Sequence, residues 1–187
     1  MTKKTFPLLH TKRLFLREFK STDAQAVFNI FSQEAVTEYY NREKMTTINE
    51  AEDLVEVRAG IFNHGVGVRW AIVMPREGNF VIGSCGIYKL DERNQSAEIG
   101  FDLHPDFWRR GIMTEALGAI ISYGYSEDFF FYLNRFQALT YLDNTASRGL
   151  LTKLGFEEEG ILRKFGHWKG QSHDLRIYSL LRNEWNK

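Results

Sequence analysis

The stretch DFWRRGIMTEALGAII, residues 106–121, decides the fold, because a basic turn leads directly into an apolar run with helical spacing. The first turn of a helix leaves backbone N–H groups without partners at the positive end of the helix dipole. Such an end binds phosphate, and Gly111 permits a positive φ or a close backbone approach. Arg109 and Arg110 add guanidinium donors for phosphate oxygens. A solvated basic turn before an ordinary core helix fits the spacing equally well, and no GxGxxG or GxxxxGK(S/T) motif decides between the two.

The segments on either side of this helix define the centre of a sheet. The alternating stretches Gln95–Leu103 and Arg135–Leu142 enclose a helix that the spacing predicts over about Met113–Asp128. In a strand–helix–strand unit of one sheet, the two strands are parallel neighbours joined by a right-handed crossover. We therefore expect these two strands to lie side by side and parallel.

Further elements surround this unit. In chain order, the patterns predict a strand at Arg13–Phe19, a helix capped at Ser21–Asp23 and running through Phe31, a helix from Asn49 to about Gly65, strands at Val68–Met74 and Asn79–Leu90, an Asn-capped helix ending on Gly155, and a closing hairpin that turns around Lys169–Gln171. The aromatic run 129–133 is expected to end the long helix and enter the core. We expect one α+β domain over residues 1–187, with a mixed, mostly antiparallel central sheet of about seven strands flanked by about four helices.

Composition narrows the class of protein. The chain has 187 residues with 24 basic and 24 acidic side chains, and this balance argues against a nucleic-acid partner. The one cysteine, Cys85, excludes an internal disulfide and suits a reducing compartment. No apolar run reaches the length of a signal-peptide core or a membrane span, so we expect a cytoplasmic protein without a membrane partner. The five histidines are scattered without HExxH or CxxC context, so no metal site is expected.

The segment FDLHPDFWRRGIMTEAL, residues 101–117, resembles the cofactor-binding segment of the GNAT superfamily of acetyl-CoA-dependent N-acetyltransferases. It is most similar to the RimJ/RimL-type branch, which acetylates the N-termini of ribosomal proteins. That branch reads aromatic-Trp-Gly-basic-Gly-x-Ala/Met-Thr-Glu-Ala, and the matching residues here are Phe107, Trp108, Arg110, Gly111 and Met113 to Ala116. Arg109 stands where the branch has its first glycine, which predicts a stiffer turn.

Three further segments carry the resemblance in the same order: AEIGF (97–101), DNTASRGLLTKLGFEEEG (143–160) and HDLRIYSLL (173–181). The resemblance extends from about Thr11 to Trp185 and implies the acyl-CoA N-acyltransferase fold, with acetyl-CoA as co-substrate. It implies that the two central strands splay apart around the pantetheine arm, while amides of the basic turn hold the pyrophosphate. The cofactor contacts that it implies are Phe101, Leu103, Arg109, Arg110, Gly111, Ile112, Met113, Thr114, Asn144 and Arg148.

Glu98 is the candidate catalytic base. An ammonium group cannot attack a thioester until a base removes its proton, and a carboxylate can do so. In SAEIGFDL, Glu98 shares one strand face with Gly100 and Asp102, and a charge on an interior strand is costly unless it faces a cleft. Members of the resembled family often have a functional glutamate at this position. The alternative is that Glu98 lies on a wet face or pairs with a nearby arginine.

Asn144 and Ser147 form the Asn-x-x-Ser pair of the resembled family. Asn144 is expected to cap its helix and, by the resemblance, to bond the pantetheine amide, and the two roles are compatible. By the resemblance, Ser147 lies near the thiol and is a candidate catalytic acid for the departing thiolate, with a tyrosine or water as alternatives. The Arg148 side chain is expected either to reach the cofactor phosphates or to lie in solvent. No covalent intermediate is required, so Cys85 is better explained as a small core residue.

We therefore expect an acetyl-CoA-dependent N-acetyltransferase acting on a primary amine, either a protein N-terminus, ribosomal or other, or a small-molecule amine. A catalytically silent acyl-CoA-binding or regulatory module on the same fold is the alternative, and Glu98, Asn144 and Ser147 favour the enzyme. The acceptor is expected to depend on the first two helices and on residues 38–67. The excess of acidic side chains in this region suits a cationic amine, and a solvated helix face explains these charges equally well. The sequence is compatible with a monomer or a homodimer.

Overall fold

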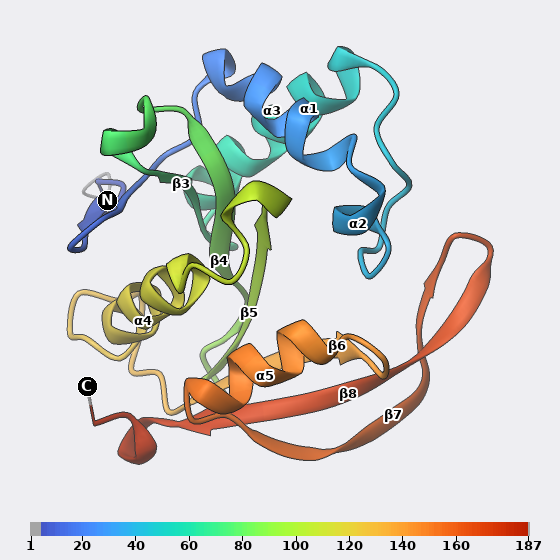
Figure 1. Ribbon diagram of the computed structural model, residues 1–187. Helices are drawn as coiled ribbons and strands as arrows, with labels where there is room; N and C mark the ends of the chain where they lie inside the picture. The colour runs from blue at the N-terminus through green and yellow to red at the C-terminus, as the bar shows by residue number, and fades with distance from the viewer. Residues whose placement is uncertain (1–4, 187) are drawn as a thin grey trace.

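The computed structural model describes residues 5–186 and contains one eight-stranded sheet with helices packed on it (Figure 1). The strands are β1 (Leu9–His10), β2 (Phe15–Arg17), β3 (Gly67–Val73), β4 (Val81–Asp91), β5 (Ser96–Leu103), β6 (Arg135–Tyr141), β7 (Glu157–Trp168) and β8 (Gln171–Leu181). The helices are α1 (Ala24–Phe31), α2 (Glu34–Thr37), α3 (Ile48–Asn63), α4 (Ile112–Gly124) and α5 (Thr145–Lys153). The strand order is β1-β2-β3-β4-β5-β6-β8-β7, and β5 with β6 is the one parallel pair among these strands.

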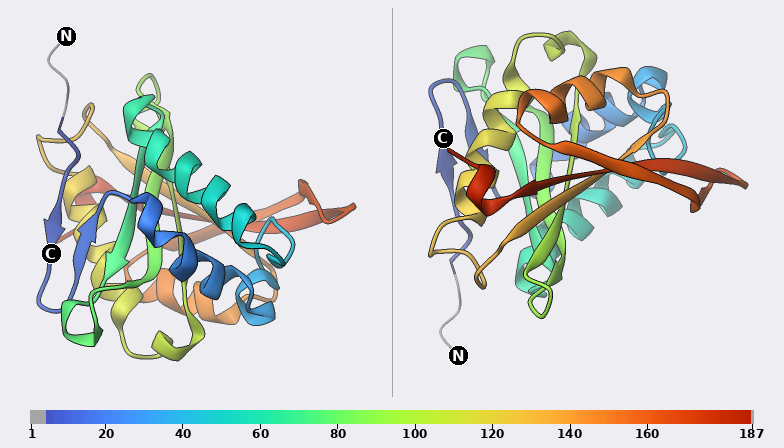
Figure 2. Two further views of the ribbon diagram at one scale, coloured as in Figure 1. Left: turned by 90° about the horizontal axis from the view of Figure 1, so that it is seen from above. Right: turned by 90° about the horizontal axis from the view of Figure 1, so that it is seen from below.

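Alternation along the central strands gives the sheet two apolar faces, because successive side chains point to opposite sides. Ala71 and Val73 of β3 face α1 and α3, and the other residues in this cluster include Val27, Ile30, Phe31, Ala51 and Val55. Trp70 and Ile72 face the opposite way and belong to the larger cluster that includes Leu117, Ile120 and Ile121 of α4 and Leu151 of α5. Figure 2 shows α1 and α3 on one side of β3–β5 and α4 on the other.

The parallel contact between β5 and β6 is short. Its three residue pairs are Ser96–Arg135, Ala97–Phe136 and Glu98–Gln137. Beyond them, β5 stays paired with β4 up to Leu103, while β6 stays paired with β8 up to Tyr141. The two strands therefore separate after Glu98, and Figure 1 shows them diverging between α4 and α5.

A buried charge cluster lies under α3 beside this separation. The Asp102 carboxylate accepts bonds from Arg69 at 2.5 Å, Arg58 at 2.8 Å and the Ser84 hydroxyl at 2.6 Å. Arg69 also donates to the Gly100 carbonyl at 3.3 Å. Burial alone would raise the pKa of Asp102, but the two guanidinium charges and the hydroxyl outweigh it and hold the pKa below its ordinary value.

Most expected elements are present, and the expected parallel pairing of the two central strands is confirmed. There are eight strands rather than about seven and five helices rather than about four, because β1 and α2, of two and four residues, are too short to show a period. The helix expected to reach Asp128 ends at Gly124, where an added Cβ would lie 2.3 Å from the Phe136 ring. Phe129 and Leu133 are buried, so the aromatic run enters the core as a loop rather than as helix.

Two expected strands have different bounds. The strand expected over Arg13–Phe19 is confined to Phe15–Arg17. The closing hairpin turns at Lys169–Gly170 as expected, but β7 already begins at Glu157. The acidic run at its start lies in the sheet because Glu158 pairs with Arg176 and Glu159 with Arg135.

The buried cluster predicts a pH-dependent stability. Asp102→Asn leaves two buried guanidinium groups without a counter-charge, so we expect it to lower the free energy of unfolding by about 3–5 kcal/mol near neutral pH. Because the folded-state pKa of Asp102 is depressed, its contribution is present above the unfolded-state pKa and is lost as the pH falls through the folded-state value. The gap between wild type and variant should therefore narrow in strong acid.

Urea unfolding of both chains over a pH series measures this gap. Asp53→Asn, on the exposed face of α3, is the control for the loss of one acidic charge. An Asp102→Asn variant as stable as Asp53→Asn at neutral pH would contradict the role assigned to the cluster.

Candidate active site

The turn before α4 has an unusual backbone. Arg109 and Gly111 both have a positive φ, of 58° and 70°, and they flank Arg110. Left-handed residues in a tight turn can direct successive N–H groups toward one concave side, a geometry that binds anions. Arg109 therefore adopts the conformation of the glycine that it replaces, at a steric cost that glycine does not have.

The first turn of α4 has backbone N–H groups that point into the space before the helix. Gly111 is the N-cap and provides no side chain to cap them. The side chains of Ile112 and Met113 are buried in the core, so these two residues present backbone rather than side chain at the turn. Thr114, the next predicted contact, is partly buried. The helix dipole adds a partial positive charge at the same point.

The two arginines of the turn differ in their surroundings. Arg110 Nη2 donates to Glu77 Oε1 at 2.7 Å, and its guanidinium lies over the Phe107 ring. Arg109 is exposed, and no hydrogen bond or ion pair joins its side chain to another residue in the described range 5–186. Arg109 is therefore the better placed of the two to meet a phosphate, while Arg110 is already engaged.

The part of β5 beyond the separation brings two predicted contacts to the α4 side of the sheet. Phe101 is partly buried and Leu103 is 9% exposed, and both belong to the α4 cluster or pack on it. The Leu103 carbonyl already accepts a bond from Trp108 Nε1 at 2.8 Å. Its backbone oxygen is thus engaged, and the Leu103 contribution is apolar.

Glu98 belongs to the last residue pair before β5 and β6 separate. It is 5% exposed, and its Oε2 accepts a bond from Lys89 Nζ at 3.0 Å. Tyr88 lies opposite it on β4, and burial together with the Glu98 charge raises the pKa of the Tyr88 phenol. Glu98 is therefore neither on a wet face nor paired with an arginine, because a lysine is its partner.

Asn144 and Ser147 occupy the start of α5. Asn144 is the N-cap, as predicted, and its Oδ1 accepts a bond from the Ser147 amide at 3.0 Å. Arg148 is half-buried; its Nε donates to the Tyr178 hydroxyl at 3.3 Å, and this hydroxyl donates to Glu158 at 2.8 Å. The starts of α4 and α5 face the opening between β5 and β6 from its two sides (Figure 1).

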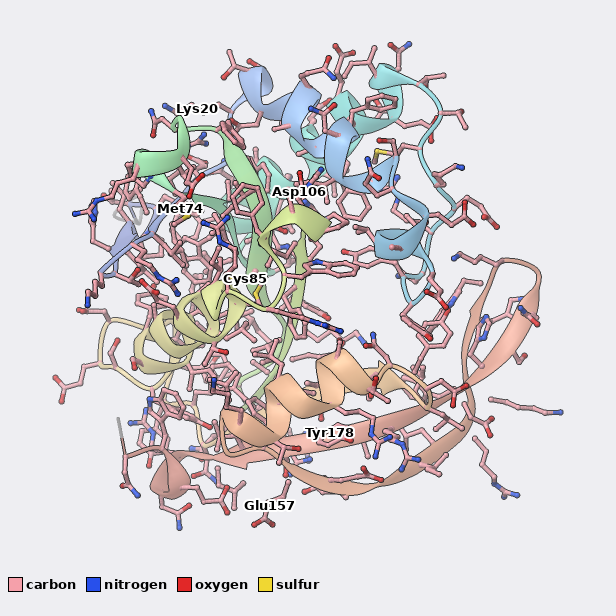
Figure 3. The ribbon with its side chains drawn as sticks, viewed as in Figure 1. Lys20, Met74, Cys85, Asp106, Glu157 and Tyr178 are labelled. Carbon is pink, nitrogen blue, oxygen red and sulfur yellow. The ribbon has the colours of Figure 1, made fainter. Side chains whose placement is uncertain are left out.

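Cys85 lies in the interior beside α4 (Figure 3) and is fully buried. Burial raises the pKa of its thiol to about 12. Because the thiolate is the nucleophilic form, this cysteine is a core residue and is not poised for attack.

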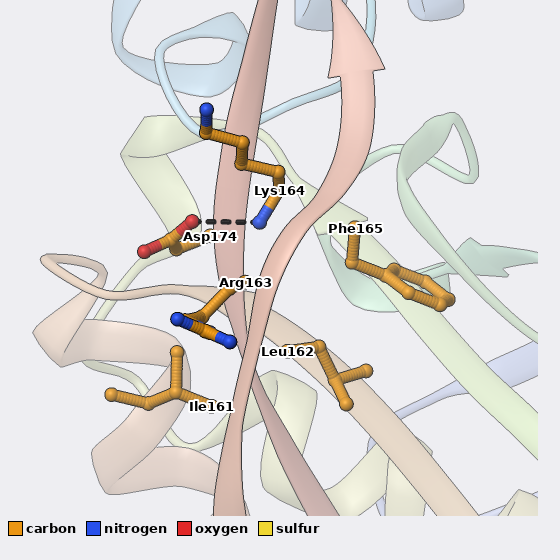
Figure 4. A pocket seen from close by; sticks show the side chains of 6 residues that line it. All are labelled: Ile161, Leu162, Arg163, Lys164, Phe165 and Asp174. Atoms are coloured by element: carbon orange, nitrogen blue, oxygen red, sulfur yellow. Dashed lines mark hydrogen bonds between the residues drawn. The ribbon is translucent and has the colours of Figure 1, made fainter.

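The linings of two surface hollows contain none of the predicted site residues. The larger, of about 700 Å³, follows a kink in β7 and is lined by Ile161, Leu162, Arg163, Lys164, Phe165 and Asp174 (Figure 4). The smaller, of about 230 Å³, lies along residues 10–15 with Pro75 and Arg76. Within residues 5–186, no three His, Cys, Asp or Glu side chains gather as a metal site, and no helix is long and apolar enough to cross a membrane.

The sequence reasoning did not identify Lys89, Tyr88 or the contacts of Arg13 with the α4 turn. Counting back from the Asp91–Ser96 pair at the turn would have placed Lys89 opposite Glu98, so this neighbour was within reach of the sequence. An irregularity between Tyr88 and Asp91 brings Tyr88 to that position instead, and the sequence does not indicate it. Arg13 and Glu115 are 102 positions apart, and no local pattern indicates that they meet.

A sequence model of the acetyltransferase (GNAT) domain matches residues 13–157. The chain is 37% identical to the Bacillus subtilis protein named uncharacterized N-acetyltransferase YoaA, over 95% of this chain and 98% of that protein. It is 35% identical to the Bacillus licheniformis protein named uncharacterized N-acetyltransferase p20, over 95% and 97%. It is also 37% identical to the putative ribosomal N-acetyltransferase YdaF of Bacillus subtilis, over 55% of each chain.

Solved structures share the fold at lower identity. The ribosomal L7/L12 α-N-protein acetyltransferase RimL, in complex with coenzyme A, aligns with a TM-score of 0.80 at 20% identity, over 94% of this chain and 98% of that one. Mycobacterium smegmatis RimJ, in complex with CoA-disulfide, aligns with a TM-score of 0.81 at 21% identity, over 93% and 84%. The expected acyltransferase fold is confirmed by these likenesses.

The left-handed turn predicts a stability difference between two substitutions. Arg109→Gly removes a steric cost of about 1–2 kcal/mol and adds about 0.4–1 kcal/mol of unfolded-state entropy, so the free energy of unfolding should stay level or rise slightly. Arg109→Val places a β-branched side chain at a positive φ and should lower it by about 1 kcal/mol or more. Denaturant unfolding of the two variants measures the difference, and equal stabilities would show that this φ is not strained.

Proposed function

Since the chain belongs to the acetyltransferase (GNAT) family and is an N-acetyltransferase, we propose that it transfers the acetyl group of acetyl-CoA to a primary amine by direct attack on the thioester. The observation that carries the proposal is the opening between β5 and β6, which has the start of α4 on one side and that of α5 on the other. We propose that residues 1–187 act as one such domain, as a monomer or homodimer, without a nucleic-acid partner or a metal. The buried free thiol supports a cytoplasmic location.

The turn before α4 is the proposed seat of the diphosphate. Amides of Gly111, Ile112 and Met113 and the exposed guanidinium of Arg109 supply donors and positive charge there. The facing edges of β5 and β6, free of each other beyond Glu98, offer backbone groups to the amides of the pantetheine arm, in the manner of an added strand. Phe101 and Leu103 supply apolar contact on the α4 side.

The side chain of Asn144 has one oxygen and one amino group, so it can cap α5 and contact the pantetheine arm at the same time. Its Oδ1 is used in capping α5 through the Ser147 amide. Its Nδ2 group remains as a donor for a pantetheine carbonyl. Arg148 lies on the same helix start, but its bond to Tyr178 makes it the weaker candidate for phosphate.

Glu98 is the proposed base. Its carboxylate is buried at the vertex of the opening and held by Lys89, so it has a fixed position close to where the strands admit a ligand. It would take the proton of the acceptor ammonium, after which the neutral nitrogen forms the bond to the acetyl carbon as the carbon–sulfur bond breaks. The Ser147 hydroxyl is proposed to give the departing thiolate its proton, directly or through water. The second proton, which the nitrogen loses as the amide forms, restores the hydroxyl through water.

The acceptor is proposed to be a protein N-terminus or a small-molecule amine. The relative YdaF, described by its name as a putative ribosomal N-acetyltransferase, supports a ribosomal N-terminus. The test is a panel of peptides and small amines with acetyl-CoA, followed by free thiol release and the mass of each product. Acetyl-CoA binding with no transfer to any acceptor would favour a catalytically silent module.

Glu98→Gln tests the proposed base within that panel. Loss of a general base should lower kcat about a hundredfold or more, while the dissociation constant for CoA stays unchanged because Glu98 is not among the diphosphate or pantetheine contacts. Thiol release gives kcat and calorimetry gives the binding constant, with Glu56→Gln on the exposed face of α3 as control. Full turnover in Glu98→Gln would remove the carboxylate from the mechanism.

Two substitutions of Asn144 distinguish its capping of α5 from its proposed contact with the cofactor. Asn144→Asp keeps an oxygen for the Ser147 amide, so the melting temperature should change little, but it loses the amino donor and should weaken CoA binding about tenfold. Asn144→Ala loses both and should also lower stability by about 1 kcal/mol. Calorimetric titration with CoA and thermal unfolding measure the two effects. Wild-type affinity in Asn144→Asp would assign this residue to capping alone.

A further inference from the structure

We propose that Arg13 is a positioning residue that aims the amides of the α4 turn at the cofactor diphosphate, an inference that rests on the function proposed above. Arg13 lies in the connection between β1 and β2, 102 positions before Glu115 of α4. It belongs neither to the turn nor to either strand of the opening. Its contacts nevertheless converge on the turn and on the first turn of the helix.

Three hydrogen bonds of Arg13 and one of Thr11 form a clamp on the start of α4. Its Nε donates to Glu115 Oε2 at 2.6 Å and its backbone amide to Glu115 Oε1 at 2.8 Å. Its Nη1 donates to the Arg110 carbonyl at 2.9 Å. The Thr11 hydroxyl completes the clamp with a bond to Glu115 Oε1 at 2.6 Å. One guanidinium thus joins the helix side chain and the turn backbone.

The grip on the Arg110 carbonyl fixes the next amide. This carbonyl and the Gly111 N–H belong to one planar, trans peptide unit, so they point in opposite directions. Holding the carbonyl toward Arg13 therefore turns the Gly111 N–H away from Arg13, to the other side of the turn. Gly111 permits this orientation because its φ is 70°. Without the grip, the peptide unit between Arg110 and the left-handed Gly111 could rotate and present an oxygen to the anion instead.

The ion pair between Arg13 and Glu115 offsets a negative charge close to the proposed diphosphate site. Glu115 is an acidic side chain in the first turn of α4, where its charge would repel a diphosphate. Arg13 supplies a compensating positive charge and two donors. Although burial would raise the pKa of Glu115, its bonds to Thr11 and Arg13 outweigh burial and lower it. The Glu115 carboxylate thus has its hydrogen-bond donors on the side that faces Arg13.

Arg13 also lies against the turn itself. Its Nη2 is 3.6 Å from the position that a Cβ on Gly111 would occupy. Nη2 donates neither the guanidinium bond to Glu115 nor the one to the Arg110 carbonyl. Its positive charge therefore lies close to Gly111, beside the proposed diphosphate site. Lysine cannot reproduce the arrangement, because one ammonium on a flexible stem lacks the planar fork that reaches Glu115 and the Arg110 carbonyl together.

The test compares ligands with and without the diphosphate. Calorimetry gives the dissociation constants of wild type, Arg13→Gln and Arg13→Lys for CoA and for pantetheine. We expect Arg13→Gln to weaken CoA binding about tenfold and to leave pantetheine binding unchanged. Arg13→Lys keeps the charge but should recover little of the loss. Arg76→Gln, which removes an exposed neighbouring positive charge, is the matched control and should weaken CoA binding much less.

Each result counts for or against the clamp. CoA binding at wild-type strength in Arg13→Gln, full recovery in Arg13→Lys, or equal losses in Arg13→Gln and Arg76→Gln would overturn it. An equal loss of CoA and pantetheine binding would reduce Arg13 to a general stabilising role. If Arg13→Gln does not fold, Thr11→Val loosens the same clamp without changing any charge and should show the same selective loss. A wild-type chain that does not bind CoA would instead refute the proposed function, and this inference with it.

Discussion

The brief parallel contact between β5 and β6 is the constraint on which the site depends. A strand inside a sheet normally satisfies its backbone groups on both edges, and unpaired buried groups are costly. Here the pairing stops at Glu98–Gln137, in the middle of the sheet rather than at its border. Side chains take up part of the loss, since Trp108 donates to the Leu103 carbonyl and the Tyr88 hydroxyl donates to that of Ile99. A ligand with amide groups suits the edges that remain.

Rigid elements hold the two strands apart. β5 is anchored on one side by the buried bonds of Asp102 to Arg58 and Arg69, which tie it to α3 and β3. β6 is anchored on the other side by antiparallel pairing with β8 along its whole length. The helices that follow each strand begin beside the opening, so the amide donors of both helix starts come from well-packed parts of the structure. A site built on such elements has its groups in place before a ligand arrives.

Local patterns in the sequence predicted much of this architecture. Alternation in residues 96–103 and 135–141 and the helical spacing after Gly111 predicted the central unit and its parallel pairing, because side-chain periodicity reports directly on burial. The Asn144 cap followed from residue chemistry alone. Contacts between distant segments could not be predicted in this way. Lys89 as the partner of Glu98 required the strand register, and the clamp of Arg13 on Glu115 required the whole fold. The left-handed φ of Arg109 is held by the surrounding turn, against the local preference of arginine.

The central claim is that the opening and the α4 turn together seat a nucleotide thioester, with the diphosphate on the turn and the pantetheine arm between the strands. A crystal structure of the chain with coenzyme A tests it most directly. The account predicts phosphate oxygens within hydrogen-bond distance of the Gly111, Ile112 and Met113 amides, and the thiol beyond the last β5–β6 pair, towards Ser147. A diphosphate bound elsewhere on the protein, with these amides facing water, would contradict it.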